Sequence, residues 1–407
     1  MSRIASRALV ALALLSRPVW GGDWPQFRGP TGQGVSDETQ LPLTWSETRN
    51  VRWRTPVAGN GWSSPVVAEG RVWVTTARVD GTVSLRALAF DVSTGELLVD
   101  TEVFSQVLAA QSNPKNTYAS PSPILDDDRV YVHFGAEGTA ALTADGEVVW
   151  RRTFPYRSQH GNGGSGVLWG DLLIVACDGD DRAFVVALDK RTGAERWRTP
   201  RPRPIAQAYS TPLVIRVGGQ DQLVAVGAFR TIAYDPATGS EIWRVRYGQG
   251  FSNVPRPVYG HGLVYIATGF QQPALLAVRA DGRGDVTDTH VAWKMRRGAP
   301  HTPSPLLVGD ELYVINDGGI ATCLDAKTGT QHWQRRIGGN HSASPVYADG
   351  RIYFQSEEGT TTVIRPGTQP QILATSQVPE ATLASLAVAD RSFFLRARGA
   401  LYRIGLE

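Results

Sequence analysis

A tryptophan that recurs at nearly regular intervals is the feature that most restricts how this chain can fold. It closes near-copies of one segment: ALDKRTGAERW, TIAYDPATGSEIW and ATCLDAKTGTQHW. Counting in both directions at intervals of 40 to 51 residues finds eight equivalent positions, namely Trp53, Val99, Trp150, Trp197, Trp243, Trp293, Trp333 and Leu373. A repeat of this length indicates stacked, structurally equivalent units rather than unrelated domains.

Each unit also opens in the same way, with a small residue or proline before an apolar stretch. The eight openings are SSPVV, SPSPIL, GSGVL, STPLV, VPRPVY, TPSPLL, SASPVY and LASLAV. A turn, an alternating aromatic stretch such as RVWVT or RVYVHF, and a third apolar stretch precede the segment that carries the tryptophan. Four short antiparallel strands in a unit of this size are typical of a β-propeller blade.

The two ends of the chain complement each other within this repeat. The last unit ends in ALYRIG, residues 400–405, with no tryptophan strand after it, whereas NVRWRTPV, residues 50–57, has no strands before it. Joining them completes one blade and removes exposed sheet edges. The sequence therefore predicts an all-β, eight-bladed β-propeller with four antiparallel strands per blade, closed by N- and C-terminal strands that share a blade.

The composition agrees with many strands joined by tight turns. The 407 residues include 43 Gly and 25 Pro, and 42% are hydrophobic, which is enough for a large core. The 41 Lys and Arg nearly balance the 38 Asp and Glu and are scattered along the chain. The basic stripe that is usual in nucleic-acid-binding proteins is absent from the sequence. We therefore expect no nucleic-acid partner.

The N-terminal segment differs from the repeat. Arg3 and Arg7 precede an apolar run over residues 8–15, which is too short to span a bilayer and is typical of a cleavable secretory signal peptide over residues 1–21. No Cys follows the run, so we expect an exported, periplasmic or secreted protein without a lipid anchor or membrane span. A Gly/Pro-rich leader over residues 22–49 is expected to pack on a single propeller of residues 50–407, and the protein is expected to be a monomer.

The recurrent D-x-x-T-G-x-x-x-W segment has a structural explanation. Its Gly can adopt a positive φ in the turn, and its Asp can accept N–H bonds from the same turn. The Trp can lie flat between neighbouring blades and donate its indole N–H to a backbone carbonyl. We assign this docking role to Trp53, Trp150, Trp197, Trp243, Trp293 and Trp333.

These segments resemble the tryptophan-docking repeats of the pyrroloquinoline-quinone (PQQ)-like propeller family. That family includes quinoprotein alcohol dehydrogenases and the propeller subunit of the outer-membrane β-barrel assembly machinery. DWPQFRGPTGQG, residues 23–34, is similar to the mature N-termini of exported PQQ-like propellers, so the resemblance runs from Asp23 to the end of the chain. It implies the fold, but enzymes and non-enzymes share this repeat.

The cysteines favour a non-catalytic member of that family. Quinoprotein dehydrogenases place adjacent, disulfide-bonded cysteines beside the quinone, hold Ca²⁺ with Glu, Asn and Asp, and use a catalytic Asp. This chain has only Cys177 and Cys323, expected as two buried thiols in different units, and no C-x-x-C-H haem motif. We expect a binding or assembly scaffold without a cofactor, for a protein, peptide or glycan partner in the cell envelope. The alternative is an oxidoreductase that uses PQQ with Ca²⁺ or another metal.

Propeller geometry places a candidate site on the axis, where the loops before the innermost strands and the turns between second and third strands converge. These loops predict a polar, aromatic-rimmed pocket for a small ligand, peptide or glycan, although solvation alone would also explain their polarity. We expect His160 and His341 to face each other across the channel. A metal bound by His301, His341 and Asp317 is a weaker alternative. The predicted lining is Trp62, Tyr118, His160, Asn162, Tyr209, Arg230, Asn253, Gln271, His301 and His341.

Overall fold

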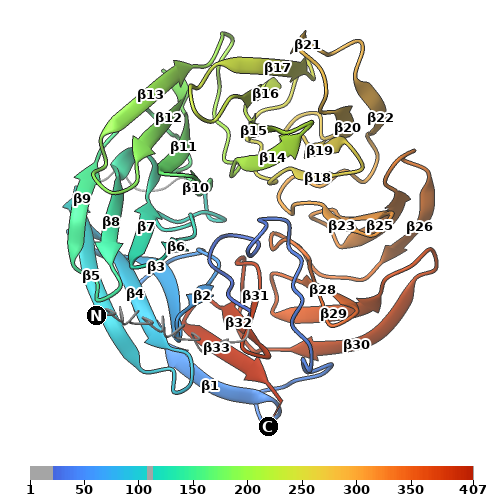
Figure 1. Ribbon diagram of the computed structural model, residues 1–407. Helices are drawn as coiled ribbons and strands as arrows, with labels where there is room; N and C mark the ends of the chain where they lie inside the picture. The colour runs from blue at the N-terminus through green and yellow to red at the C-terminus, as the bar shows by residue number, and fades with distance from the viewer. Residues whose placement is uncertain (1–21, 108–112, 407) are drawn as a thin grey trace, which may run out of the picture.

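Eight β-sheets arranged around a central axis make up the computed structural model, which describes residues 22–107 and 113–406 (Figure 1). Each sheet is one blade, and in every blade except the one that contains both chain ends the first four strands run outward from the axis in chain order. The predicted eight-bladed propeller is confirmed. The predicted signal peptide lies outside the described residues. Within those residues, no helix has the length and apolar character needed to cross a membrane.

The first four blades follow one another along the chain. Blade 1 consists of β2 (Val66–Ala68), β3 (Arg71–Asp80), β4 (Thr82–Asp91) and β5 (Leu97–Gln106). Blade 2 consists of β6 (Ile124–Asp126), β7 (Arg129–His133), β8 (Thr139–Thr143) and β9 (Val148–Arg152). The short 3-10 helix η1 (Gly135–Glu137) lies between β7 and β8. Blade 3 consists of β10 (Val167–Trp169), β11 (Leu172–Asp178), β12 (Ala183–Asp189) and β13 (Glu195–Pro200). Blade 4 consists of β14 (Leu213–Val217), β15 (Gln220–Val226), β16 (Arg230–Tyr234) and β17 (Glu241–Arg246).

The remaining blades complete the ring. Blade 5 consists of β18 (Val258–Gly260), β19 (Leu263–Ala267), β20 (Leu275–Arg279) and β22 (Val291–Met295). Blade 6 consists of β23 (Leu306–Val308), β24 (Glu311–Ile315), β25 (Ile320–Asp325) and β26 (Gln331–Arg336). Blade 7 consists of β27 (Val346–Ala348), β28 (Arg351–Gln355), β29 (Thr360–Arg365) and β30 (Gln371–Gln377). Blade 8 consists of β31 (Ala387–Ala389), β32 (Ser392–Arg396), β33 (Ala400–Gly405) and β1 (Val51–Pro56).

Blade 8 closes the ring with strands from both ends of the chain. The outermost strand β1 pairs antiparallel with β33, so that Val51 lies opposite Ile404 and Thr55 opposite Leu401. This is the predicted closure. Blade 4 differs from the four-strand prediction because β21 (Gly284–Asp285), from the long turn of blade 5, adds a parallel fifth strand beside β17.

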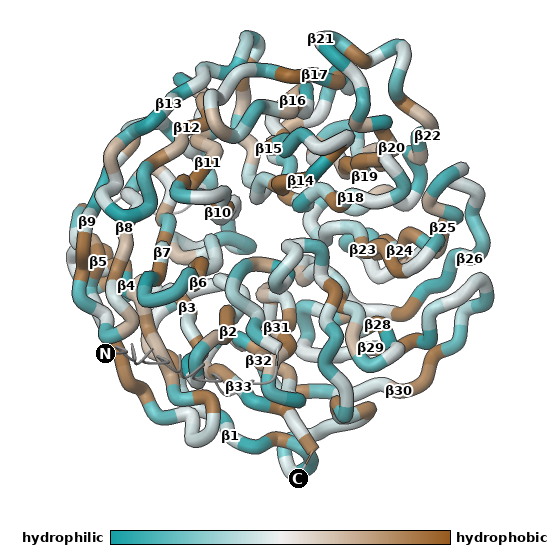
Figure 2. The backbone as a smooth tube through the Cα atoms, in the orientation of Figure 1, coloured by the Kyte–Doolittle hydropathy of each residue, from teal (hydrophilic) through white to brown (hydrophobic). Residues whose placement is uncertain are grey.

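The core lies between adjacent blades rather than at the centre of the ring. Apolar residues recur along the strands, while many of the turns are hydrophilic (Figure 2). One buried layer joins Ile174 and Val185 of blade 3 to Leu223 and Ile232 of blade 4. Because each blade buries its faces against two neighbours, the ring is held together by a series of small cores. Both cysteines are buried and free.

The recurrent tryptophans bridge successive blades. In five of them the indole N–H donates to a carbonyl in the turn of the next blade, at 2.9 to 3.0 Å: Trp53 to Val92, Trp150 to Lys190, Trp197 to Pro236, Trp293 to Ala326, and Trp333 to Gly367. Trp243 instead donates to Gln222 Oε1 at 2.8 Å, because β21 occupies the place of the usual turn.

The leader crosses the face opposite the blade-opening loops (Figure 1). Trp24 forms a β-bridge with Val67 of blade 1, and Val35 forms another with Tyr347 of blade 7. The Trp45 N–H then donates to Ser376 Oγ of blade 7 at 3.0 Å. These contacts carry the leader across the axis, and its central residues therefore reach the base of the channel.

Candidate functional site

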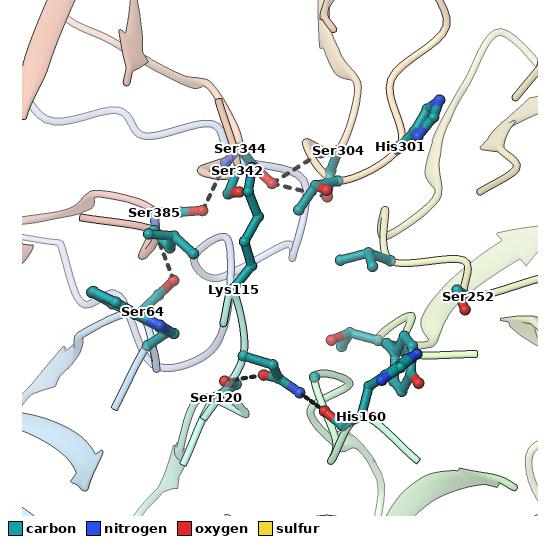
Figure 3. A pocket seen from close by; sticks show the side chains of 18 of the residues that line it. Ser64, Lys115, Ser120, His160, Ser252, His301, Ser304, Ser342, Ser344 and Ser385 are labelled. Atoms are coloured by element: carbon teal, nitrogen blue, oxygen red, sulfur yellow. Dashed lines mark hydrogen bonds between the residues drawn. The ribbon is translucent and has the colours of Figure 1, made fainter. Parts of the chain in front are cut away.

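A funnel of about 450 Å³ opens at the axis on the face of the blade-opening loops (Figure 3). All eight blades contribute residues to its lining. Trp62, Asn116, His160 and Tyr209 come from the loops before blades 1 to 4, and Phe27 of the leader closes the base. The volume lies within the range of small-ligand pockets and is sufficient for a few side chains of a partner protein.

A belt of hydroxyl groups surrounds the base of the funnel. The position two residues before each innermost strand carries a hydroxyl in seven blades and an arginine in blade 5: Ser64, Ser122, Ser165, Thr211, Arg256, Ser304, Ser344 and Ser385. We call these eight residues the hydroxyl ring. Seven of them donate their backbone N–H to the hydroxyl of the next blade, at 2.8 to 3.0 Å. Since each such bond contributes about 1 kcal/mol, the ring is a structural belt.

The hydroxyl ring is the part of the site that sequence reasoning missed. Its signal is visible in the blade openings, where Ser or Thr precedes Pro and an apolar residue in five of the eight units. In the sequence these residues stand out only as the small residues that open each unit, and the predicted lining lies farther upstream. Their role becomes evident only when the eight positions converge on one axis.

Arg256 is the one member of the hydroxyl ring without a hydroxyl, and its side chain anchors the leader instead. Its Nε donates to Pro212 O at 3.1 Å, and its Nη1 donates to Phe27 O at 2.5 Å. A Cβ on Gly32 would lie 2.4 Å from Arg256 Nη1, so a side chain at this position would have to displace the guanidinium. Burial lowers the pKa of Arg256 to about 9, so the guanidinium is still cationic at neutral pH. The arginine therefore holds Phe27 under the funnel.

The walls of the funnel carry a few charged groups that are already engaged. Lys115 extends over the opening toward Ser342, and its Nζ lies 2.8 Å from Glu357 Oε1 (Figure 3). Asp317 is the one carboxylate among the described lining residues. It accepts bonds from the His301 N–H at 2.8 Å and the Thr302 hydroxyl at 2.7 Å. These groups tie neighbouring loops together.

An aromatic rim lies on one side of the opening. Phe251 and Phe270 line the funnel with their ring centroids 5.6 Å apart, in an edge-to-face arrangement. Phe229 continues the series at 6.4 Å from Phe251. Phe270 is 56% exposed, which is unusual for a large aromatic side chain. The rim and Trp62 offer apolar contact area above a polar base.

Four of the ten predicted lining residues contribute to the funnel: Trp62, His160, Tyr209 and His301. Asn253 is fully buried and bonds Gly227 O at 2.7 Å, while Asn162 is buried and bonds Gly164 O at 3.1 Å. Tyr118 packs against the core between blades 1 and 2. Gln271 is exposed outside the lining, and Arg230 lies in a different groove. Four of these five residues lie on loops and Arg230 begins β16, and none of the five lines the funnel.

His341 is the remaining case, and its geometry contradicts both roles proposed for it. Its side chain is 1% exposed and does not line the funnel, so it does not face His160 across the channel. Its two ring nitrogens lie 3.0 Å from the carbonyls of Gln355 and Gly338, which leaves no nitrogen for a metal. Burial lowers its pKa. Among the described residues, no group of three His, Cys, Asp or Glu side chains is placed to hold a metal ion.

The residues present do not fit a quinone with Ca²⁺. Asp317, the single lining carboxylate, already accepts two hydrogen bonds within its own loops. Oxygen-rich coordination by several carboxylate or carbonyl groups is what Ca²⁺ requires. Cys177 and Cys323 lie on β11 and β25 of different blades, and neither lines the funnel. The donor set of the quinoprotein dehydrogenases is therefore not reproduced.

The sequence matches the model of one known protein family over most of its length. The model of a family described as outer membrane protein assembly factor BamB matches residues 34–167 and 181–407, which is most of the propeller. The chain belongs to this family. Membership in the BamB family confirms the resemblance to PQQ-like propellers that the tryptophan repeats indicated. No curated protein sequence matches the chain.

Solved structures of family members and of enzymes resemble the chain about equally. BamB from Moraxella catarrhalis matches at 15% identity and a TM-score of 0.61, over 87% of this chain and 99% of its own. Quinohemoprotein alcohol dehydrogenase from Comamonas testosteroni matches at 11% identity and a TM-score of 0.67, over 95% of this chain and 81% of its own. The computationally designed Ika8 protein matches at 10% identity and a TM-score of 0.63, over 86% of this chain and 98% of its own. At these identities the similarity shows the fold alone.

Proposed function

We propose that this chain is an exported, non-catalytic binding or assembly module that holds a segment of a partner protein at its axial funnel. The observation that carries the proposal is the aromatic rim, because Phe270 is 56% exposed beside Phe251 at the mouth of the cavity. Exposed aromatic side chains beside a polar pocket are typical of surfaces that bind other proteins.

The lining chemistry supports binding rather than catalysis. The hydroxyls of the hydroxyl ring accept backbone N–H bonds from neighbouring blades, and Asp317 caps two loop donors. The labelled ring serines Ser304, Ser344 and Ser385 are joined to one another through backbone N–H groups in Figure 3, so these hydroxyls are engaged in the belt. A partner side chain that entered the funnel would contact Trp62 and the phenylalanines on the rim. It would reach the hydroxyl ring at the base.

Export of the protein is part of the same proposal. Arg3, Arg7 and the apolar run over residues 8–15 predict a signal peptide. The description of the family as an outer membrane protein assembly factor supports a partner in the cell envelope. A partner of this kind would be a protein exported to the same compartment.

Site-specific photocrosslinking in the native host tests this proposal. A photoreactive phenylalanine analogue in place of Phe270 should give a discrete adduct with one envelope polypeptide, and Trp62→Ala should weaken that adduct several-fold. Leu98 is the matched control, because it is 45% exposed but lies on the outer strand β5, away from the funnel. Equal adducts at Leu98 and Phe270, or none at Phe270, would contradict a partner site at the rim.

A further inference from the structure

Arg230, which was predicted for the funnel, lines a separate groove of about 390 Å³ at blade 4. We call this the arginine groove. Its walls come from the loop after β13, the turn before β16, the strand β17 and the added strand β21. The lining residues are Pro202, Arg203, Pro204, Phe229, Arg230, Arg244, Arg246, Gly248 and Asp285.

Arg230 is held rigidly at the back of the arginine groove. Its side chain is 8% exposed, and its guanidinium donates to Pro202 O at 2.9 Å and to Pro204 O at 3.3 Å. Neutral carbonyl oxygens therefore receive its bonds. Burial lowers the pKa of Arg230, and repulsion from Arg244 lowers it further. A buried cation without a nearby anion is costly, so the groove favours a negatively charged ligand.

The other three arginines surround the opening with incomplete neutralisation. Arg246 pairs with Asp285 at 2.9 Å, and Arg244 pairs with Glu241 at 3.0 Å. Arg203 is exposed, and no ion pair joins it to an acidic side chain of the described residues. Four guanidinium groups thus meet two carboxylates, which leaves an excess of two positive charges.

The geometry points to a phosphomonoester group as the ligand of the arginine groove, and we propose that the protein binds such a group there. A phosphomonoester dianion matches the excess charge, and its three terminal oxygens can accept bonds from several guanidinium groups at once. A carboxylate has one charge and two oxygens, so it would leave part of the cluster unsatisfied. Phe229, Pro202 and Pro204 supply an apolar wall for the organic group attached to the phosphate.

Two sources of this group differ in how the protein would meet them. A small soluble phosphate ester would enter the arginine groove from solution, whereas a lipid headgroup would bring the edge of blade 4 to a membrane surface. Glycerol 3-phosphate tests the first source by calorimetry. Sedimentation with phosphatidylcholine vesicles, prepared with and without phosphatidic acid, tests the second. Saturable binding in either experiment supports the proposal and identifies the source.

Three variants of the intact protein make the test specific. Arg203→Ala should weaken binding about tenfold, because it removes an exposed charge-assisted donor. Asp285→Asn should tighten binding about threefold or more, since it frees Arg246 while keeping an oxygen that can accept the Thr287 N–H. Arg335→Ala, on the exposed outer strand β26 of blade 6, removes the same charge elsewhere and should leave binding unchanged.

Several results would overturn the proposal. One is the absence of saturable binding to both glycerol 3-phosphate and phosphatidic acid vesicles. Another is an equal loss in Arg335→Ala and Arg203→Ala, which would indicate attraction to the net charge of the surface. Unchanged affinity in Asp285→Asn would show that the arginine groove is not the binding site. The outcome is independent of the crosslinking at Phe270, because the two sites share no charged residue.

Discussion

At the scale of single residues, the contact between a tryptophan and the glycine of the next turn determines how closely the blades approach. Gly193 has a φ of +69°, and a Cβ on it would lie 2.6 Å from the Trp150 ring. Asp189 Oδ1 accepts the Thr192 N–H at 2.9 Å and so holds the same turn. The turn is thus shaped to let the indole lie flat against the backbone.

Replacing Gly193 by Ala should therefore destabilise the propeller through two effects. The positive φ costs about 1–2 kcal/mol for a residue with a Cβ, and displacement of the Trp150 ring adds about 1–3 kcal/mol. Gly170→Ala is the matched control, because Gly170 has a φ of +54° with no atom within 4 Å of the added Cβ. Urea unfolding should show a clearly larger loss for Gly193→Ala. Equal losses would mean that the indole contact is unimportant.

This residue pair also shows what the sequence could predict. The Asp, Gly and Trp of the repeat act through neighbours in the same or the adjacent unit, so their spacing predicts their contacts. Asn253 lies on a loop as predicted, whereas Arg230 is the first residue of β16, and the sequence does not show whether the side chain at either position points to the axis or into its own blade. Phe27 reaches the funnel from the leader, at a distance in sequence that no local pattern reveals.

At the scale of elements, the innermost strands are joined by the hydroxyl ring rather than by a continuous sheet. The innermost strand is only three residues long in seven of the eight blades, and in every blade it begins two residues after a member of the hydroxyl ring. Among the described residues, none of the innermost strands pairs with a strand of the next blade. The bond from the Ser64 N–H to Ser122 Oγ, at 2.9 Å, illustrates how a side chain replaces that pairing.

Removing one hydroxyl should expose the importance of this belt. Ser122→Ala leaves the buried Ser64 N–H without its acceptor, which should cost about 1–3 kcal/mol of unfolding free energy. Ser122→Thr keeps the oxygen, as the chain itself does at Thr211, and should cost less than about 1 kcal/mol. Thermal or urea unfolding of the two variants measures the difference. An alanine variant as stable as the threonine variant would show that the ring contributes nothing.

At the scale of the whole molecule, the ring owes its closure to the pairing of β1 with β33. The register from Val51 opposite Ile404 to Pro56 opposite Ala400 joins the first propeller strand to the last. Tyr402 and Leu401 of β33 are buried in the core of blade 8. A closed ring spreads each local distortion over eight interfaces, and this keeps both the funnel and the arginine groove in shape.

Opening the ring should therefore affect the entire protein rather than one blade. Truncation after Arg398 removes β33, exposes the edges of β1 and β32, and uncovers the apolar face of blade 8. The truncated chain should aggregate or unfold over a broad, less cooperative transition in calorimetry and size-exclusion chromatography. Truncation after Gly405 removes only Leu406 and Glu407, leaves the pairing with β1 intact, and should change neither readout. A monomeric truncation after Arg398 with the original sharp transition would mean that seven complete blades suffice and that the terminal strands are not the closure on which both sites depend.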